Sequence, residues 1–535
     1  MDIATFERVC EQFYAANSSE AARREAQNLM SRICGATESV AFLQQVLVNS
    51  SVSSAVVSAS TALTKLVASN WINITEQEKT DIYGALVHLI NREFFPELAR
   101  PYLNRFFAKV VKYAWLDGAK FQTVFDDLRA LGAPDVGRVL DTYTEVIREM
   151  NPQTGRDLSR FRRTALSFRD QALVKMAEFA WQLIERGEVG VQQHKALKLL
   201  VEALAFDFLG ACPDETNDDT ASVMVPHSFV FLRQISIPQV LFNLLGDLGS
   251  KESAKLALQA LVLVASFRRS FYLKDEDRRA VLFAFLSGSA QLISGVTPAS
   301  QRLLSDPDCV HEICRLIGRM KTGDAVSDLI EVDGFQLWLG AVWQLTERVV
   351  LTRRNAHVET ANARFYLLSF WGQVSVGASR MTAVPAYLQE AINRVLTGFI
   401  DNLIHNQEAA ISDSEDGSPD ETEIAEQTEI FAALITSSKH FAVSTLQTAL
   451  MHSGRHVNVA WGVYLTSVLL HAVAEQKIDN PETVERLATI SGVIMQGMRT
   501  SRTRGDNGGV RTFGSGDNRN MTGCHICNHH RNEEW

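Results

Sequence analysis

The residues best suited to metal chemistry form the run Cys524-His525-Ile526-Cys527, which is followed by His529 and His530. Two thiolates in C-x-x-C spacing and an imidazole are ligand types that build tetrahedral zinc sites. No second half-site accompanies the run at a distance, and the segment around it is rich in Gly, Asn and Arg. Two interpretations stay open: the run binds zinc, or it is an unstructured chain end that has no function. The second interpretation is favoured, and no metal ligand or cofactor is assigned.

A second group of possible ligands consists of Cys309, His311 and Cys314. On a helix, His311 and Cys314 are neighbours, whereas Cys309 points elsewhere. A core helix that begins after Asp306-Pro307 explains all three residues better than a metal site does.

Two arginine groups could bind an acidic partner, but each lies close to acidic residues in the sequence. Arg268 and Arg269 come shortly before Asp275, and Arg169 directly precedes Asp170. Internal ion pairs are therefore the simpler expectation for both groups.

An acidic group that follows Pro213 is a candidate for binding a basic surface on a partner. Its members are Asp214, Glu215, Asp218 and Asp219. A solvated loop is the ordinary explanation for such a charge run.

Catalytic signatures are missing from the sequence. It contains no Gly-rich phosphate loop, no nucleophile elbow and no zinc-protease helix motif. A missing motif does not exclude an enzyme, but nothing in the sequence favours one, and we expect a non-catalytic protein.

Composition narrows the possible partners. The net charge of −10 argues against a general nucleic-acid or anionic-membrane binder. The seven cysteines are scattered, which is typical of reduced core thiols in a cytosolic or nuclear protein. Residues 1–6 show no signal peptide, and the most apolar segment, Leu256 to Phe267, is too short to span a bilayer. We expect this segment to be a buried helix.

Helical periodicity runs through most of the 535 residues, and strand-like alternation is nearly absent. Apolar residues predict helices at Val136 to Met150 and Ser167 to Ile184, among others. Asn17 with Glu20, and Thr75 with Glu78, have the spacing of capping boxes.

Amphipathic helices of this kind must bury one face, and stacked antiparallel pairs bury it in one continuous core. The predicted fold is therefore all-α, an α-α superhelix of the armadillo/HEAT-repeat type. At roughly 40–47 residues per pair, it would hold about ten pairs. The alternative is a pair of unrelated helical domains.

Several short motifs then resemble, in order, the exportin-7 family, the Ran-binding-protein group of the importin-beta superfamily. They include Leu166-Ser-Phe-Arg-Asp170, Leu204-Ala-Phe-Asp-Phe-Leu-Gly210 with the acidic run after it, Val264-Ala-Ser-Phe-Arg-Arg-Ser270, and Phe365-Tyr-Leu-Leu-Ser-Phe-Trp371. The resemblance covers roughly residues 1 to 460. Members of the family continue with further repeats, so this chain is expected to match their N-terminal portion.

The resemblance implies a nuclear transport receptor that binds Ran-GTP, protein cargo and nuclear pore proteins, and that shuttles between nucleus and cytoplasm. It implies neither nucleic-acid binding nor membrane insertion, and we expect a monomer. The segment around Lys65 and Trp71 is similar to the family's Ran-binding region, which makes Lys65 the best single contact residue and Trp71 a packed one. A helical scaffold or adaptor without Ran binding is the alternative.

The resemblance and the periodicity together predict five segments. These are Ran-binding repeats at 1–110, HEAT-like repeats at 111–405, an acidic linker at 406–428, further helical repeats at 429–499 and a disordered tail at 500–535.

Overall fold

The computed structural model describes residues 2–130, 135–151, 158–187, 189–208, 223–247, 249–323, 325–351 and 361–405. The chain divides into two compact units, and helices α1 to α20 lie wholly within the first, which contains residues 1–399. Within the described ranges, the only strand-like feature is an isolated parallel bridge between Val223 and Phe267. The all-α prediction is confirmed.

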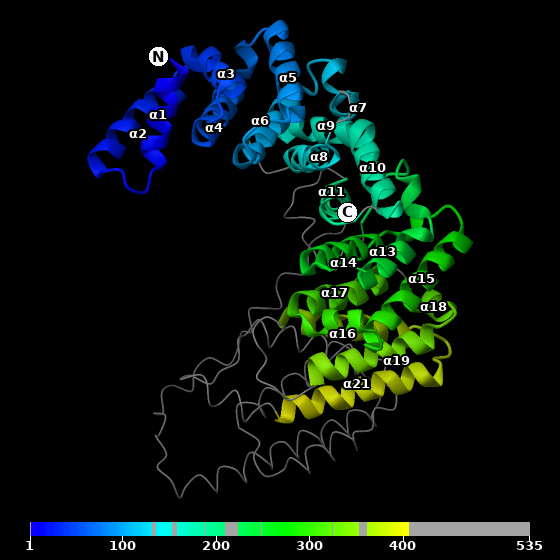
Figure 1. Cartoon of the computed structure of the whole chain (residues 1–535). Helices are drawn as coiled ribbons and strands as arrows, with labels where there is room; N and C mark the ends of the chain where they lie inside the picture. Colours follow the sequence, from blue (N-terminus) through cyan, green and yellow to red (C-terminus); the bar gives the residue numbers. More distant parts are fainter. Residues whose placement is uncertain are drawn as a thin grey trace, which may run out of the picture. The chain divides into compact units, whose positions relative to one another are not determined.

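The helices of the first unit form two layers (Figure 1). In one layer every helix packs on the next, and in the other only some neighbouring helices make comparable contacts. One layer contains the second helix of each pair: α4 (Ser53–Asn70), α6 (Arg100–Ala114), α8 (Val136–Met150), α11 (Val191–Leu204), α14 (Lys251–Ala265), α17 (Pro307–Gly323) and α20 (Ala361–Ser379). The other contains the first helices: α3 (Val40–Asn49), α5 (Glu76–Asn91), α7 (Val124–Ala130), α10 (Val174–Glu185), α13 (Ser236–Asp247), α15 (Asp275–Ser294) and α19 (Phe335–Thr346).

Pairing between the layers follows the order of the chain. For example, α3 packs on α4, α5 on α6, α10 on α11 and α13 on α14. The remaining α-helices are α1 (Ile3–Tyr14), α2 (Glu20–Gly35), α9 (Leu158–Phe168), α16 (Pro298–Ser305), α18 (Val326–Ile330) and α21 (Ala386–His405). This is the α-α superhelix predicted from the sequence. Its later repeats are longer than the expected 40–47 residues, because α11, α14 and α17 begin at Val191, Lys251 and Pro307.

Helix starts show where local chemistry decides the boundaries. Thr75 and Glu78 form the predicted capping box at the start of α5, with Glu78 N donating to Thr75 Oγ1 over 3.3 Å. The capping box predicted for Asn17 and Glu20 is wrong. Ser19 is the N-cap of α2, and its hydroxyl accepts from Ala22 N over 3.2 Å, so Glu20 is the first helical residue.

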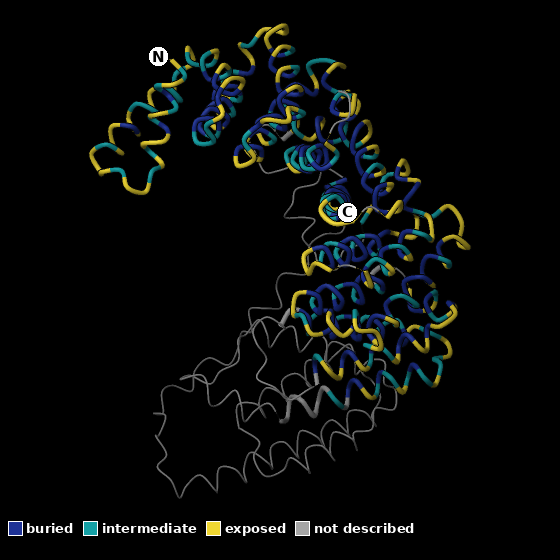
Figure 2. Tube along the Cα trace, in the orientation of Figure 1, coloured by how far each residue is buried: buried dark blue, intermediate teal, exposed yellow. Residues whose placement is uncertain are grey.

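Buried residues lie mainly where helices pack together, and many exposed residues lie in the turns that join helices (Figure 2). Three tryptophans are fully buried, and each indole N–H donates to a hydroxyl oxygen. Trp115 reaches Ser167 at 3.1 Å, Trp338 reaches Ser289 at 2.8 Å and Trp371 reaches Thr346 at 2.9 Å. These bonds remove the cost of burying an unpaired donor.

The apolar segment from Leu256 to Phe267 lies mostly in α14, and its helical part packs inside the unit, as predicted. In the described ranges, no single helix is long and apolar enough to cross a bilayer. Helices α15 and α16 pass that test only as a pair, and they are bent by 79° relative to each other.

Candidate partner-binding surface

Lys65 lies on the solvent-facing side of α4, as expected for a contact residue. It is exposed together with Thr61 and Ser69, which are four residues away on either side and therefore share its face. Lys65 is the only charged residue in α4. It makes no ion pair among the described residues, so its ammonium group is available to a partner.

The neighbouring helix α6 is also basic and, like α4, contains no acidic residue. Its Arg105 side chain is 63% exposed and lies 3.5 Å from Glu145 of α8. Lys109 and Lys112 both reach Glu149 of α8, at 2.7 and 3.1 Å. Burial lowers the pKa of the Lys112 ammonium, and the Glu149 carboxylate opposes that shift. Lys65 and Arg105 are thus the cations that α4 and α6 present most openly.

Ion pairs between second helices recur farther along the layer. Lys195 of α11 contacts Asp141 of α8 at 2.6 Å, and Lys251 in the first turn of α14 contacts Asp306, just before α17, at 2.6 Å. We call this series, together with the Lys109–Glu149 pair, the ion-pair ladder. The α4–α6 contact cannot take part in it, because neither helix contains an acid.

A different polar cluster joins the ends of α4 and α6. The Asp117 carboxylate accepts from Trp71 Nε1 at 2.9 Å, from Lys79 Nζ at 2.8 Å and from Arg160 at 3.1 Å. Trp71 is 3% exposed, so the prediction that it packs is confirmed. The Lys79 ammonium also lies 5.0 Å from the centre of the Trp71 ring. We call these four residues the Asp117 cluster.

Sequence reasoning missed the Asp117 cluster. Asp117 lies about 40 residues from each of its three partners in the chain, and no periodic pattern marks a carboxylate in a turn. The lack of acidic residues in α4 and α6 was readable from the sequence and would have pointed to the surface around Lys65.

The arginine groups mostly make the expected internal pairs. Arg269 contacts Asp275 at 2.9 Å and Asp328 at 3.2 Å, and Arg169 contacts Asp170 at 2.7 Å. These contacts support the structural interpretation of Arg269 and Arg169.

Cys309 and Cys314 are buried in α17, which begins at Pro307, and this confirms that they are core residues. No group of three or more possible metal ligands occurs in the described ranges.

Other predicted sites cannot be placed. The acidic candidates Asp214, Glu215, Asp218 and Asp219 lie outside the described residues, as do the Cys524–Cys527 run and the predicted segments from 406 onward.

Comparisons with known proteins identify relatives of the chain. Exportin-7-A of Xenopus laevis is 27% identical over 420 residues, which is 74% of this chain and 37% of that protein. Ran-binding protein 16 of Drosophila melanogaster is 26% identical, and the alignment covers 75% of this chain and 39% of that protein. Ran-binding protein 17 of Homo sapiens is 26% identical, and the alignment covers 78% of this chain and 39% of that protein. The chain therefore spans less than two fifths of these relatives.

No family model matches the chain. Among solved structures, an engineered protein aligns with a TM-score of 0.43 and 13% identity, covering 93% of this chain and 99% of its own. A structure of importin beta aligns with a TM-score of 0.29 and 11% identity, and the alignment covers 94% of this chain and 74% of the importin beta chain.

Proposed function

We propose that this chain, a relative of exportin-7 and of Ran-binding proteins 16 and 17, is a nuclear transport receptor that binds Ran-GTP and protein cargo. Its similarity over about three quarters of its length to proteins with those names carries the proposal. Interactions with nuclear pore proteins, a monomeric state and shuttling between nucleus and cytoplasm belong to the same proposal. No catalytic step is part of it.

Ran-GTP would bind the surface formed by α4 and α6, with Lys65 at its centre. The surface supports this role because Lys65 is exposed and has no ion partner among the described residues, and because Arg105 adds a second accessible cation. Two accessible cations beside a helix pair without acids favour an acidic patch on the partner. The acidic residues Asp214, Glu215, Asp218 and Asp219 stay a proposal for a basic surface on Ran or on cargo.

Binding of Ran-GTP and of cargo would be coupled through the stacked helices. Each ligand would hold neighbouring pairs in one arrangement, and the second ligand would then meet a smaller ordering cost.

The direct test measures the affinity of the full chain for Ran loaded with a non-hydrolysable GTP analogue or with GDP. We expect selective binding of the GTP form. Lys65→Glu should weaken that binding about tenfold or more, because it reverses a charge inside the interface. Lys274→Glu is a matched control, since Lys274 is exposed just before α15 and makes no ion pair within the described part of the chain.

The outcomes separate two questions. Equal or absent binding of both nucleotide forms would refute the transport-receptor proposal and favour a scaffold without Ran binding. Selective binding that Lys65→Glu leaves unchanged would refute only the placement of the contact on α4.

A further inference from the structure

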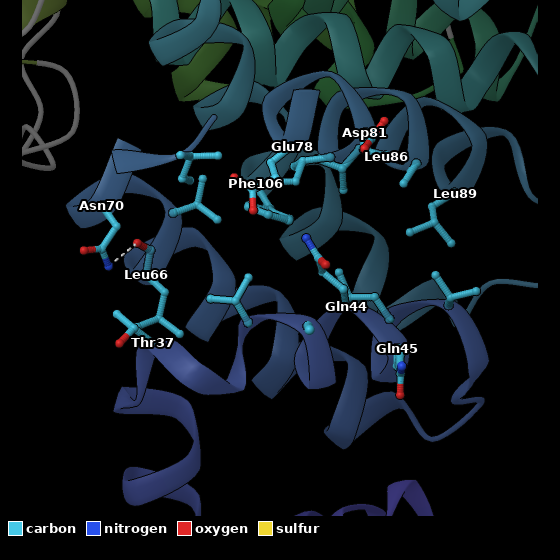
Figure 3. Close-up of a pocket in the computed structure, with 18 of the residues that line it drawn as sticks. Thr37, Gln44, Gln45, Leu66, Asn70, Glu78, Asp81, Leu86, Leu89 and Phe106 are labelled. Atoms are coloured by element: carbon cyan, nitrogen blue, oxygen red, sulfur yellow. Dashed lines mark hydrogen bonds between the residues drawn. The ribbon is translucent and has the colours of Figure 1, made fainter. Parts of the chain in front are cut away.

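A groove of about 940 Å³ lies between the first helices α3 and α5 (Figure 3). Gln44 and Gln45 come from the α3 wall, and Glu78 and Asp81 from the α5 wall. Leu66 of α4 and Phe106 of α6 also line the groove. The exposed cations of the proposed Ran surface, Lys65 and Arg105, do not line it.

The accessible apolar surface of the groove comes from a few exposed residues on its two walls more than from its buried leucines. Leu66 and Leu86 are only 7% and 2% exposed. Val48 on the α3 side is 42% exposed, and Ala41 of α3 and Ala85 of α5 are both exposed. Small side chains on both walls let the backbone of a third helix approach closely.

The charges of the groove have one sign. Its described lining includes the carboxylates of Glu38, Glu78 and Asp81 and no Lys, Arg or His. The hydrogen bond from the Thr75 hydroxyl lowers the pKa of Glu78, which therefore stays ionised at neutral pH. Glu38 and Asp81 are exposed on opposite walls, so a cationic segment lying between them would meet negative charge on both sides.

The length of the walls suits a short helix. Helix α3 has 10 residues, which corresponds to about 15 Å, or roughly three helical turns. A helix of that length could place aliphatic side chains on the rims and basic side chains beside the carboxylates, as helix-in-groove complexes do.

We propose that the α3–α5 groove binds a basic amphipathic helix of a partner protein. Its aliphatic face would contact Val48, Ala41 and Ala85, and its Lys or Arg side chains would pair with Glu38 and Asp81. This goes beyond the proposed binding of Ran, since it assigns a second partner surface on the first-helix layer.

The test uses the full chain and a fluorescein-labelled helical peptide about three turns long, with leucines at i, i+3, i+4 and i+7 and lysines elsewhere. Fluorescence anisotropy gives its Kd. The same peptide with glutamates in place of the lysines should not bind. Glu38→Lys combined with Asp81→Lys should raise the Kd of the lysine peptide about tenfold or more. Glu78 is left intact, because it caps α5.

The matched control is Glu11→Lys with Glu25→Lys, which changes the net charge equally at exposed positions outside the groove. Its Kd should stay within about twofold of the wild-type value. Variants that fill the groove with a large side chain test its shape independently of its charge. Ala85→Trp and Ala41→Trp, on opposite walls, should each raise the Kd about tenfold.

Three results would overturn the proposal. They are no binding of the lysine peptide by the wild-type chain, equal loss in the control pair, and undiminished binding by both filling variants. Equal loss in the control would mean that the peptide responds only to the overall negative charge. None of these outcomes depends on whether Ran binds, so the two proposals fail separately.

Discussion

Replacing Asp117 by alanine should loosen the N-terminal helix pairs, because it removes the one carboxylate on which the Asp117 cluster depends. Lys79 Nζ lies 2.8 Å from Asp117 Oδ2, and the two side chains are only 11% and 18% exposed. Breaking such a pair leaves a poorly hydrated cation, which costs about 3 kcal/mol at the lower end of the range for buried pairs. The lost bond from Trp71 Nε1 adds about 1 kcal/mol. We therefore expect a total of about 3–4 kcal/mol.

Local hydrogen exchange is the suitable assay, because a repeat array of this length need not unfold as one unit. A loss of about 3–4 kcal/mol corresponds to amide exchange that is two to three orders of magnitude faster in α4, α5 and α6, since each factor of ten is worth about 1.4 kcal/mol. Adding Lys79→Met to Asp117→Ala should restore a large part of the protection, because it removes the stranded charge.

Asp126→Ala is the matched control. Asp126 pairs with Lys175 at 3.5 Å, but these side chains are 62% and 51% exposed, and such pairs contribute about 0–1 kcal/mol. If Asp117→Ala accelerates exchange no more than Asp126→Ala does, the cluster is not a stabilising junction. If the double variant Asp117→Ala with Lys79→Met exchanges as fast as Asp117→Ala alone, the unpaired Lys79 charge is not the cause of the loss.

Two further predictions concern the packed interior. Gly377→Ala should destabilise the protein by about 1–3 kcal/mol, because its new Cβ would lie 2.4 Å from Val326 Cγ2; thermal melting should show partial recovery with Val326→Ala and no loss for Gly340→Ala, where nothing lies within 4 Å. Burial raises the pKa of the Cys10 thiol from 9.0 to about 12 and raises that of Cys314 as well. Both should resist iodoacetamide at pH 8 until guanidinium is added, as peptide mass mapping would show; labelling at the same rate without guanidinium would contradict their burial. Because the folded-state pKa is the higher one, the stabilisation linked to Cys10 is complete below pH 9.0 and is lost as the pH rises toward 12, which melting temperatures across that range would reveal.

Local patterns predicted the helices well because the chemistry that defines them is local. Val136 to Met150 forms a helix with the predicted bounds, since its apolar spacing lies within one element. The residues from Ser167 to Ile184 are helical as predicted, but the predicted start is wrong, because the helical run already begins at Leu158 and passes through an unforeseen π-helical stretch at Arg169–Leu173. Arg169 also donates to Phe208 O at 2.5 Å, a contact with a later segment that spacing cannot reveal.

The candidate surface was predictable only in part. Trp71 was expected to pack, and it is 3% exposed; Lys65 was expected to contact a partner, and it is exposed as such a role requires. Their surroundings were not predictable, because Asp117 and Glu149 act on residues 37 to 46 positions away in the chain. The groove was missed for the same reason, since it depends on the separation between two helices that only the stacking of pairs determines.

Among the described residues, the α4–α6 contact lacks a kind of polar link that several later contacts of the second-helix layer have. Lys109–Glu149 joins α6 to α8, Lys195–Asp141 joins α11 to α8, and Lys251–Asp306 joins α14 to the start of α17. Within the described part of the chain, no such pair joins α4 to α6, and the polar link between them is the Asp117 cluster at the helix ends. An acidic partner that bridged Lys65 and Arg105 would supply the missing connection across this contact. Partner binding there would therefore reduce the relative motion of α4 and α6, with the Asp117 cluster as the fixed end, and exchange in both helices should slow when Ran-GTP binds.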